Sequence, residues 1–491
     1  MRRLAVAPVL LLAAGCLVGP DYERPAVETP PAFLWEVTDA QETADTTWWQ
    51  QFEDPVLDGL IAEALASNKN VKIAAANVEQ AAALLRVTRS PLYPQVGVGA
   101  TGSESRASES GAVALPDVIP NPTTSYELVG TVSWELDLWG RIRRLTESAQ
   151  ASLLATEEGR RGVILSVVGS TANGYLQLRA LDEQLAIARR TLGTYAESVR
   201  LFELQFKYGL KSQMTVEQAR ISYETAAAKI PQLESQVAQT EHLISTLLGR
   251  NPGPIPRGKS ILELTLPAVP AGMPSELLER RPDIRQAEQN LVAVNAQIGA
   301  AKALYYPTIS LTGVFGQSSS ELEELFDGPA RVWSYGGSIV GPLFTGGAVS
   351  GQVRQVEAAR EAALLGYEAA IQAAFADVDN ALVARAKLVD QVAAQERLVA
   401  ASREYARLAR LQFDGGVTPY FTVLQAEQQL FPAELNLVAN RASLFVSLVD
   451  LYKAMGGGWV TEAEAMTAAP AGSAAAPAPG SAVTGGSSEG D

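Results

Sequence analysis

Two stretches of this chain, residues 204–219 and 411–426, are variants of one another. They align without a gap and are identical at about half of their positions, which chance similarity rarely gives over such a length. Each stretch carries a glycine, Gly209 or Gly416, where a helix is expected to end, and a serine or threonine shortly after it. The sequence therefore predicts the same helical hairpin twice, and the rest of the fold has to be built around these two turns.

The helices that lead into the turns are long. Residues 141–206 contain no proline, and from Leu178 to Phe206 the apolar positions alternate spacings of three and four residues, as in helices that pack against partner helices. Residues 347–413 form a second such helix. At 1.5 Å per residue each helix would be roughly 100 Å long. No compact core buries a rod of that length, so we expect the helices to pack side by side.

Two segments with the alternating pattern of β-strands precede each long helix: residues 95–103 and 125–138 in the first half, and residues 308–317 and 332–344 in the second. Within the second of these segments, Trp134 lies on an apolar face, whereas Glu135 and Asp137 lie on the opposite, polar face. Both an ordinary soluble strand and a lipid-facing barrel strand show this pattern.

Four strands are too few to close a barrel, because closure takes about eight strands even for a filled interior. Open strand edges are not tolerated in lipid. If the strands are embedded in a membrane, several copies of the chain must therefore share one barrel. Glu135 and Asp137 would then face its water-filled lumen.

The order short helix, strand pair, long helix and returning helix occurs twice, which predicts two repeats at residues 48–250 and 275–459. A proline-rich connector, residues 251–274, joins them. Residues 460–491 consist mainly of alanine, glycine, serine and proline, and this composition predicts a disordered tail. The predicted fold class is mainly α, with two internal repeats, four strands and two long helical hairpins per chain.

The N-terminus has the pattern of an export signal. Residues 1–15 contain a basic start followed by an apolar segment that is too short to remain as a membrane span. Small residues then precede Cys16, the only cysteine of the chain, in an arrangement that resembles a bacterial lipobox. We expect a signal peptide over residues 1–15, a covalent lipid on Cys16 and an extended tether over residues 16–47; the alternative is a plain signal peptide with an incidental cysteine. By resemblance to such lipoproteins, Leu17 favours sorting to the outer membrane.

The composition excludes several functional classes. The formal net charge of −15 argues against a nucleic-acid partner, because no basic stripe is present to neutralise phosphates. With one histidine, His242, a histidine-based metal site and a catalytic triad are close to excluded, and one cysteine excludes a thiolate cluster or a disulfide framework. We therefore predict no catalytic residue, no bound metal, no cofactor besides the lipid on Cys16, and no enzymatic activity.

Several motifs resemble those of a known family: Cys16–Pro25, Trp48–Trp49, Arg280–Ile284, Asp377–Leu382 and Leu451–Trp459. With these motifs the chain resembles, over nearly its whole length, the outer membrane factor (TolC-like) family of efflux and type I secretion channels, in its lipoprotein branch. The resemblance implies a homotrimer, with a twelve-stranded membrane β-barrel that continues into a twelve-helix tunnel in the periplasm. It also implies a lipid-anchored protein of the cell outer membrane. Such a protein works with a periplasmic adaptor (a membrane fusion protein) and an inner-membrane pump of the RND type to export drugs or other small molecules.

In that family the paired turns form the periplasmic tip, where the tunnel narrows to a gate and the adaptor docks. By resemblance the candidate tip residues are Lys207, Tyr208, Gly209, Leu210, Lys211, Ser212, Asp414, Gly415, Gly416, Val417 and Thr418. The lipoprotein branch often has an aspartate where this chain has Thr418, so the gating carboxylate is absent from its usual place. We expect Thr418 to act as a helix N-cap before Pro419. Asp414 either replaces that carboxylate, by pairing with a lysine or arginine of a neighbouring subunit, or is a solvated tip residue.

Two other interpretations remain open at this point. A type I secretion conduit for polypeptides has the same architecture, although the lipobox favours the efflux branch. A non-channel periplasmic coiled-coil lipoprotein, of structural or adaptor type, also has helical hairpins, but it would lack matching strand pairs in both halves of the chain.

Overall fold

The computed structural model of the chain describes residues 17–35, 46–108, 120–270 and 274–467. The signal peptide predicted over residues 1–15 and the lipidated Cys16 lie outside the described residues, as do residues 468–491 of the predicted tail. None of the helices in the described ranges combines the length and the hydropathy that a membrane-crossing helix needs.

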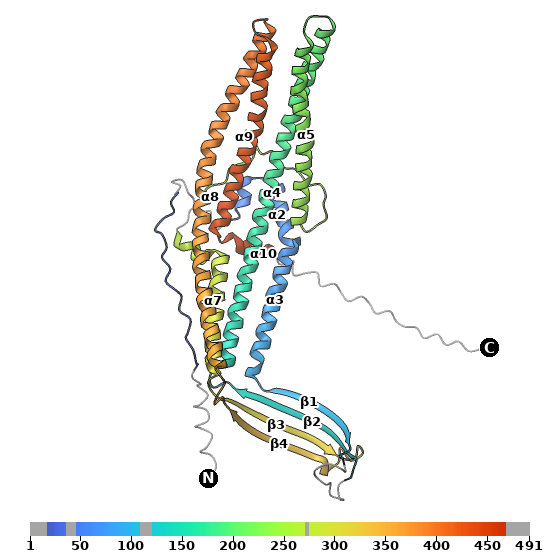
Figure 1. Ribbon diagram of the computed structural model, residues 1–491, viewed down its shortest axis with the longest axis vertical. Coiled ribbons are helices and arrows are strands. Elements are labelled where there is room, and N and C mark those ends of the chain that lie inside the picture. Colours follow the sequence, from blue (N-terminus) through green and yellow to red (C-terminus); the bar gives the residue numbers. More distant parts are fainter. Residues whose placement is uncertain (1–16, 36–45, 109–119, 271–273, 468–491) are drawn as a thin grey trace, which may run out of the picture.

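The molecule is a long rod of helices with a four-stranded sheet at one end (Figure 1). The first repeat contains α2 (Pro55–Ser67), α3 (Lys69–Arg89), β1 (Gln95–Ser105), β2 (Thr123–Leu136), α4 (Arg141–Lys207) and α5 (Gln213–Leu247). The second contains α6 (Leu277–Arg280), α7 (Pro282–Ala303), β3 (Thr308–Ser319), β4 (Arg331–Val340), α8 (Ala348–Asp414) and α9 (Tyr420–Met455), and is followed by α10 (Trp459–Thr467). Helices α4 and α8 have 67 residues each and run from the sheet to the far end of the rod, where turns lead into α5 and α9.

The sheet is antiparallel throughout, in the order β1-β2-β3-β4, and directly opposed residues share one of its faces. One face is predominantly apolar and carries Val96, Val98, Tyr126, Leu128, Val132, Trp134, Ile309, Leu311, Phe315, Trp333, Tyr335 and Ile339. The other face is mainly polar and carries Thr101, Glu127, Thr131, Ser133, Glu135, Ser310, Thr312, Ser334 and Ser338.

The sheet of one chain is incomplete by itself. Strands β1 and β4 form its edges, and each has a strand partner on one side only among the described residues. On the apolar face of β4, Trp333 and Tyr335 stack with ring centroids 5.8 Å apart and are 66% and 83% exposed. Open edges beside an exposed apolar face invite pairing with another chain.

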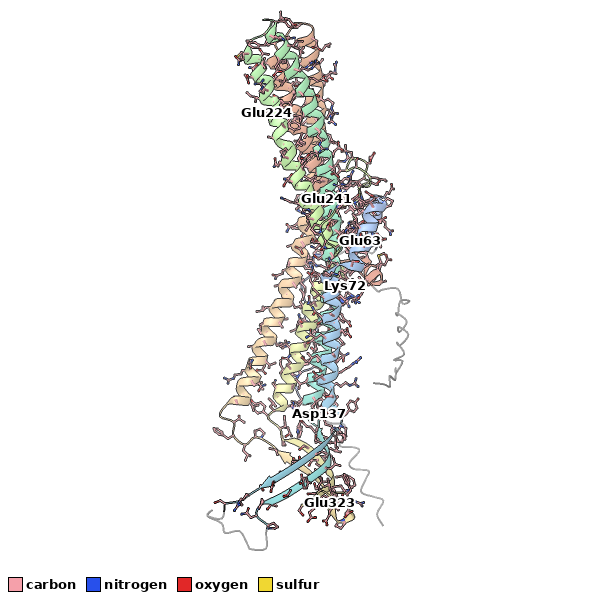
Figure 2. The ribbon with its side chains drawn as sticks, turned by 90° about the vertical axis from the view of Figure 1, so that its right-hand side faces the viewer. Glu63, Lys72, Asp137, Glu224, Glu241 and Glu323 are labelled. Atoms are coloured by element: carbon pink, nitrogen blue, oxygen red, sulfur yellow. The ribbon has the colours of Figure 1, made fainter. Side chains whose placement is uncertain are left out.

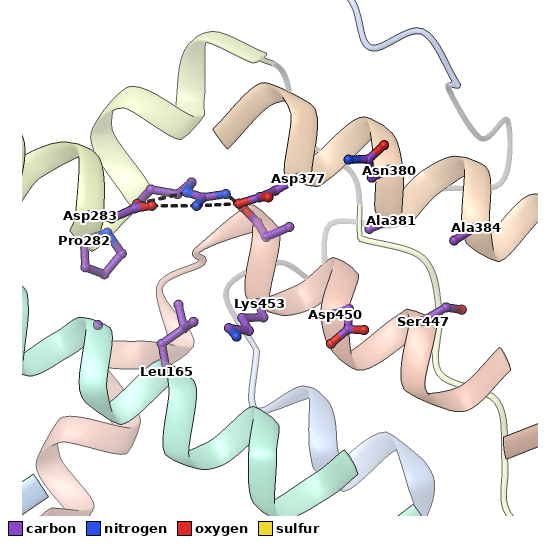
Figure 3. A pocket seen from close by; sticks show the side chains of 13 residues that line it. Leu165, Pro282, Asp283, Asp377, Asn380, Ala381, Ala384, Ser447, Asp450 and Lys453 are labelled. Carbon is purple, nitrogen blue, oxygen red and sulfur yellow. Dashed lines mark hydrogen bonds and ion pairs between the residues drawn. The ribbon is translucent and has the colours of Figure 1, made fainter. Parts of the chain in front are cut away.

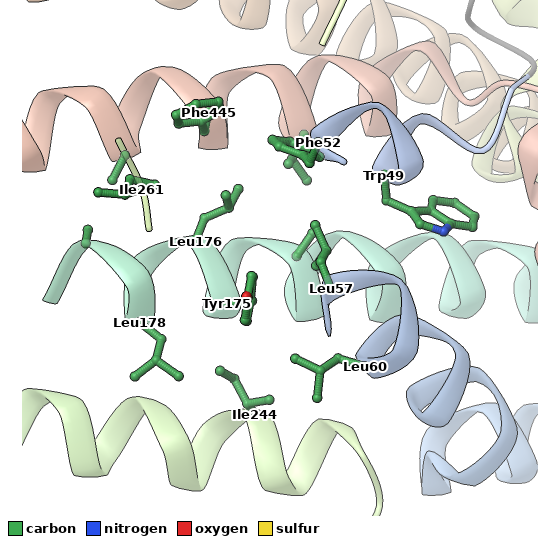
Figure 4. Packing of buried hydrophobic residues seen from close by; sticks show 14 of the residues in the cluster. Trp49, Phe52, Leu57, Leu60, Tyr175, Leu176, Leu178, Ile244, Ile261 and Phe445 are labelled. Atoms are coloured by element: carbon green, nitrogen blue, oxygen red, sulfur yellow. The ribbon is translucent and has the colours of Figure 1, made fainter. Parts of the chain in front are cut away.

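The main hydrophobic core lies where α2, α4, α5 and the end of α9 meet (Figure 4). Its aromatic centre comes from distant parts of the chain: Trp48, Trp49, Phe52, Phe445, Tyr452 and Trp459. Beside it, the fully buried Asp54 accepts hydrogen bonds from the Tyr175 hydroxyl (2.6 Å) and the Lys259 N–H (3.1 Å). The core therefore ties the start of the first repeat, the connector and the C-terminal part of the chain to α4.

Arg281 fixes the start of α7 to the second helical hairpin. Its guanidinium donates to both carboxylate oxygens of Asp283 (2.9 and 2.6 Å), to Asp377 of α8 (3.0 Å) and to the Ala454 carbonyl near the end of α9 (3.1 Å). Three of the family-like sequence motifs therefore meet in one ion cluster around the buried Arg281.

Strand β4 ends at Val340 rather than at residue 344, so the predicted end of this strand is wrong. Pro342 has no backbone N–H to donate to a neighbouring strand, and the ladder stops before it. Leu343 and Phe344 are instead exposed in the segment that leads to α8.

The prediction of disorder from residue 460 is wrong for residues 460–467, which belong to α10. Trp459 and Val460 are buried in the main core, and Glu464 binds Arg160 and Arg161 of α4 (3.0 and 3.1 Å). The alanine- and glutamate-rich composition suits a helix as well as a tail, and contact with the core decides between the two.

Residues 17–35 contain no helix or strand, but they are packed on the rod rather than free, as a tether would be. Asp21 forms an ion pair with the buried Arg144 (2.7 Å), and Arg24 forms ion pairs with Glu279 and Glu288. These ion pairs with residues far along the sequence hold the segment in one conformation. Its proline-rich composition does not indicate this.

Candidate functional site

The two turns at the end of the rod have the same backbone geometry. After α4, Gly209 has φ 70° and its N–H bonds to the Phe206 carbonyl (2.9 Å), while the Leu210 N–H bonds to the Gln205 carbonyl (2.8 Å). After α8, Gly416 has φ 73°, and the two equivalent bonds measure 2.9 and 2.8 Å. This is a Schellman C-cap, which needs one residue in the left-handed conformation and so favours glycine.

The two hairpins contact each other just behind the turns. Phe202 of α4, Phe413 of α8 and Tyr420 of α9 form an aromatic cluster, with ring centroids 4.1 Å apart for Phe202–Tyr420 and 5.5 Å apart for Phe413–Tyr420. Lys211 of the first turn lies over the Phe413 ring, 5.6 Å from its centroid. The tip is therefore held together by a small cluster of its own, separate from the main core.

Charged and apolar side chains mix on the outer surface of the tip. Tyr208, Leu210 and Val417 are exposed there. Asp414 lies 3.6 Å from Arg410, one turn earlier on the same helix, and both side chains are partly exposed. Asp414 thus has a partner within its own chain, and its carboxylate is still accessible to a second one.

The prediction that Thr418 caps α9 is wrong. Pro419 occupies the cap position with an extended backbone (φ −70°, ψ 156°), so the helix begins at Tyr420, one residue later than expected. The Thr418 hydroxyl oxygen is buried and has no hydrogen-bond partner among the described residues. In the first turn, Ser212 occupies the cap position of α5, but its hydroxyl lies 3.3 Å from that of Thr215 instead of binding a backbone N–H.

Behind the aromatic cluster lies a group of buried and partly buried polar side chains that the sequence patterns did not indicate. Burial raises the pKa of Glu427 on α9, although the charge of Arg410 opposes this, and its Oε2 has no hydrogen-bond partner in the described part of the chain. Burial and the charge of Glu427 also raise the pKa values of Tyr195 on α4 and of Tyr420. These side chains come from both hairpins, so only the docking of the hairpins buries them.

A sequence profile of the outer membrane efflux protein family matches two segments, residues 60–250 in the first repeat and residues 273–457 in the second. The chain belongs to the outer membrane efflux protein family. It is similar to the toluene efflux pump outer membrane protein TtgC of Pseudomonas putida, with 35% identity over 470 residues that cover 93% of this chain and 95% of TtgC. It is also similar to the cation efflux system protein CusC of Escherichia coli, with 33% identity over 457 residues that cover 92% and 97% of the two chains. Among solved structures, the outer-membrane channel OprN matches with a TM-score of 0.81 at 30% identity, covering 91% of this chain and 100% of OprN.

Membership of the outer membrane efflux protein family makes this chain an efflux channel of the outer membrane that extends into the periplasm, and the family is not enzymatic. The predicted TolC-like fold, with its two repeats, four strands and two long hairpins, is confirmed. The alternative of a non-channel coiled-coil lipoprotein is thereby removed. In the described ranges, no three His, Cys, Asp or Glu side chains are grouped so that they could hold a metal ion.

In this efflux channel, the two carboxylates predicted to face the lumen lie near the junction of the sheet and α4, where Figure 2 labels Asp137. Asp137 is 8% exposed and accepts hydrogen bonds from the N–H groups of Ile142 (3.0 Å) and Arg143 (2.9 Å). It therefore caps the helix in place of Gly140, which occupies the cap position without a side chain. Glu135, on the polar face of the sheet, accepts three hydrogen bonds from the guanidinium of Arg141 (2.8, 2.9 and 3.3 Å). The lumen-facing position of both residues stays a prediction.

Proposed function

We propose that three copies of the chain form one continuous conduit, with a twelve-stranded barrel in the outer membrane and a twelve-helix tunnel in the periplasm. The incomplete sheet is the observation that carries this proposal. Pairing the β4 edge of one copy with the β1 edge of the next leaves no open edge. The apolar face then meets lipid, and the polar face lines a wet lumen.

The cargo of this conduit is a drug or another small molecule, delivered by a periplasmic adaptor and an inner-membrane pump of the RND type. The names of the relatives support a broad range, because one is named for toluene efflux and another for cation efflux. A wide passive tunnel fits such a range, since molecules this different share no single recognition chemistry.

A covalent lipid on Cys16 anchors the conduit to the outer membrane in addition to the barrel. The position of the next residues supports this anchor, because the Val18 N–H bonds to the Trp139 carbonyl (3.2 Å), between β2 and the start of α4. Val18 therefore lies close to the level at which the sheet meets the helices, where the membrane surface lies in this arrangement. Cys16→Ser should abolish incorporation of labelled palmitate; retained label in the variant would place the lipid elsewhere.

The paired turns act as the periplasmic gate and as the docking site of the adaptor. Their residues are Lys207, Tyr208, Gly209, Leu210, Lys211, Ser212, Asp414, Gly415, Gly416, Val417 and Thr418. Exposed apolar side chains beside exposed charges suit a docking surface, and Asp414 retains an accessible carboxylate for a neighbouring subunit. With Thr418 at the position where an aspartate is common in the family, Asp414 is the carboxylate that holds the gate closed.

Conductance and assembly test the conduit directly. Protein extracted from outer membranes should migrate as a trimer that dissociates on heating, and it should give a small closed-state conductance in planar bilayers. Asp414→Ala should raise that conductance. Glu404→Ala is the matched control, because Glu404 is an exposed carboxylate paired with Arg407 on the same helix. A monomer that does not conduct contradicts the conduit, whereas an unchanged closed-state conductance in Asp414→Ala contradicts only the gate.

A further inference from the structure

A cavity of about 500 Å³ lies between α4, α8 and α9, next to the Arg281 ion cluster (Figure 3). Its volume is within the range of about 300–1,000 Å³ that is usual for sites that hold small molecules. Leu165 of α4 and Ala384 of α8 supply apolar wall, while Asp377, Asp450 and Lys453 supply charge. No step of the proposed gating or docking uses this cavity.

The cavity opens on the side of the helices that faces away from the main core. On α9, Asp450 and Ala454 line the cavity, whereas Val449 and Tyr452, on the opposite face of the same helix, are buried in the core. On α8, Asp379 accepts a hydrogen bond from the Leu34 N–H of the N-terminal segment (2.9 Å), while Asp377 lines the cavity. The bulk of the main core and the N-terminal segment therefore lie on one side of the helical wall and the cavity opens on the other, with Leu165 at the border between core and cavity. In the proposed trimer the tunnel has to stay open, so the covered side faces outward and the cavity faces the lumen.

The wall next to Arg281 carries an excess of negative charge. One guanidinium is shared by two carboxylates, those of Asp283 and Asp377. These carboxylates are 51% and 55% exposed, so each can also interact with a molecule in the cavity. Arg281 itself is directed into the protein, where it binds the Ala454 carbonyl.

The opposite wall carries the carboxylate of Asp450 and the ammonium of Lys453. Asp450 accepts a hydrogen bond from the Asn173 amide (3.2 Å) and takes part in no ion pair among the described residues. The ammonium of Lys453 likewise has no carboxylate within ion-pair distance in the described ranges. The cavity therefore has three carboxylates and two cationic groups, a formal charge of −1, and part of that charge is not neutralised locally.

We propose that this cavity is a binding site for organic cations in transit through the tunnel. The cationic nitrogen lies between the carboxylates of Asp377 and Asp450, and the apolar body rests on Leu165 and Ala384. Lys453 keeps the site weak, because its charge repels the same ligand, and a conduit has to release what it binds. The inference rests on the proposed function, since only a tunnel brings exported molecules past this wall.

Titration with ethidium, a planar aromatic cation, tests the site in the full-length protein in lipid nanodiscs, with empty nanodiscs as the blank. Asp450→Asn should weaken ethidium binding about fivefold, the size of one partly exposed charge interaction. Lys453→Met should tighten it by a similar factor, because a like charge is removed. Both effects should shrink as salt is added. Glu396→Gln is the matched control, since this exposed carboxylate lies further along α8, outside the cavity wall, and should leave ethidium binding unchanged.

Opposite shifts in the two variants support the site, because a general loss of folding moves both in one direction. Absent binding to the wild-type protein, or shifts of the same sign in Asp450→Asn and Lys453→Met, overturns the site. Conductance is measured on the same wild-type preparation, which separates the two proposals. A conducting trimer that does not bind ethidium contradicts the proposed binding site but not the conduit, whereas a monomer that does not conduct contradicts both proposals.

Discussion

Replacement of Arg281 by methionine should loosen the start of α7 more than any change at the surface of the helices. Burial alone would lower the pKa of Arg281, but the hydrogen bonds and charges of Asp283 and Asp377 raise it overall, so the side chain stays charged. Methionine keeps the apolar stem and removes the charge and the donors. The Ala454 carbonyl then loses its side-chain donor, and both carboxylates lose their counter-ion.

The contacts of Arg281 set the size of the effect. Removal of one partner from a buried ion pair costs about 3–5 kcal/mol. Asp283 and Asp377 are about half exposed, so water can take the place of the guanidinium on them, and we expect the lower limit, about 3 kcal/mol. At 1.4 kcal/mol per factor of ten, the first turns of α7 should open about a hundredfold more often.

Hydrogen–deuterium exchange of the assembled protein, read by mass spectrometry, measures this opening without global unfolding. Amides at the start of α7 should exchange about a hundredfold faster in Arg281→Met, while those of α5, which does not touch Arg281, should not change. Arg354→Met is the control for the substitution itself, because Arg354 is exposed on α8 and has no ion pair among the described residues. An α7 rate within about threefold of wild type would refute the role given to Arg281, because it corresponds to less than 1 kcal/mol.

Three further predictions concern the ends of the rod. Gly209→Ala and Gly416→Ala should each destabilise the tip by about 1 kcal/mol, since no atom within 4 Å would obstruct the added methyl group and only the positive φ is costly; limited proteolysis should cut the turns about fivefold faster. Asp137→Ala removes two backbone hydrogen bonds and the ion pair with Arg143 from the start of α4, and should cost about 2 kcal/mol. The temperature at which the proposed trimer dissociates should fall, and less so in Asp137→Asn. Because the pKa of Glu427 is raised, its protonated form stabilises the docked hairpins. This contribution to the free energy of docking is complete below the ordinary pKa of 4.5 and is lost as the pH rises through the raised pKa. Exchange in α9 should therefore be slower at pH 5 than at pH 7 after correction for intrinsic rates, and Glu427→Gln should abolish the difference.

The hairpins were predictable because their signals are local. A Schellman cap needs glycine at one position, so Gly209 and Gly416 mark the turns whatever surrounds them. Heptad spacing predicts α4 for the same reason, since all residues of the pattern lie in one continuous helix. The alternation around Trp134 and Glu135 also predicted which side chains share a face of the sheet, and the observed register agrees.

The errors arose where distant segments decide the structure. Helix α10 forms because Trp459 packs in the aromatic core and Glu464 forms ion pairs with α4. Neither contact can be inferred from an alanine-rich composition. Thr418 was expected to cap a helix by its spacing to Pro419, but the extended backbone of the proline moves the start of α9. Burial of Glu427 has no sequence signal, because it depends on two hairpins that are far apart in the chain.

The two turns are alike in backbone and unlike in charge, and this difference is what a gate can use. The first turn carries Lys207 and Lys211, whereas the second follows Asp414. In a ring of three chains the two kinds of turn alternate, so each acidic turn has a basic turn of its own chain on one side and of a neighbour on the other. Within one chain, Lys211 already lies over Phe413 and Asp414 near Arg410. The groups left to attract each other across the subunit boundary are therefore the lysines of the neighbour's first turn and the accessible carboxylate of Asp414. In the proposed gate, a duplicated scaffold therefore needs only this difference in charge, and no new fold, for a tip that closes by pairing between subunits and opens when an adaptor competes for the same side chains.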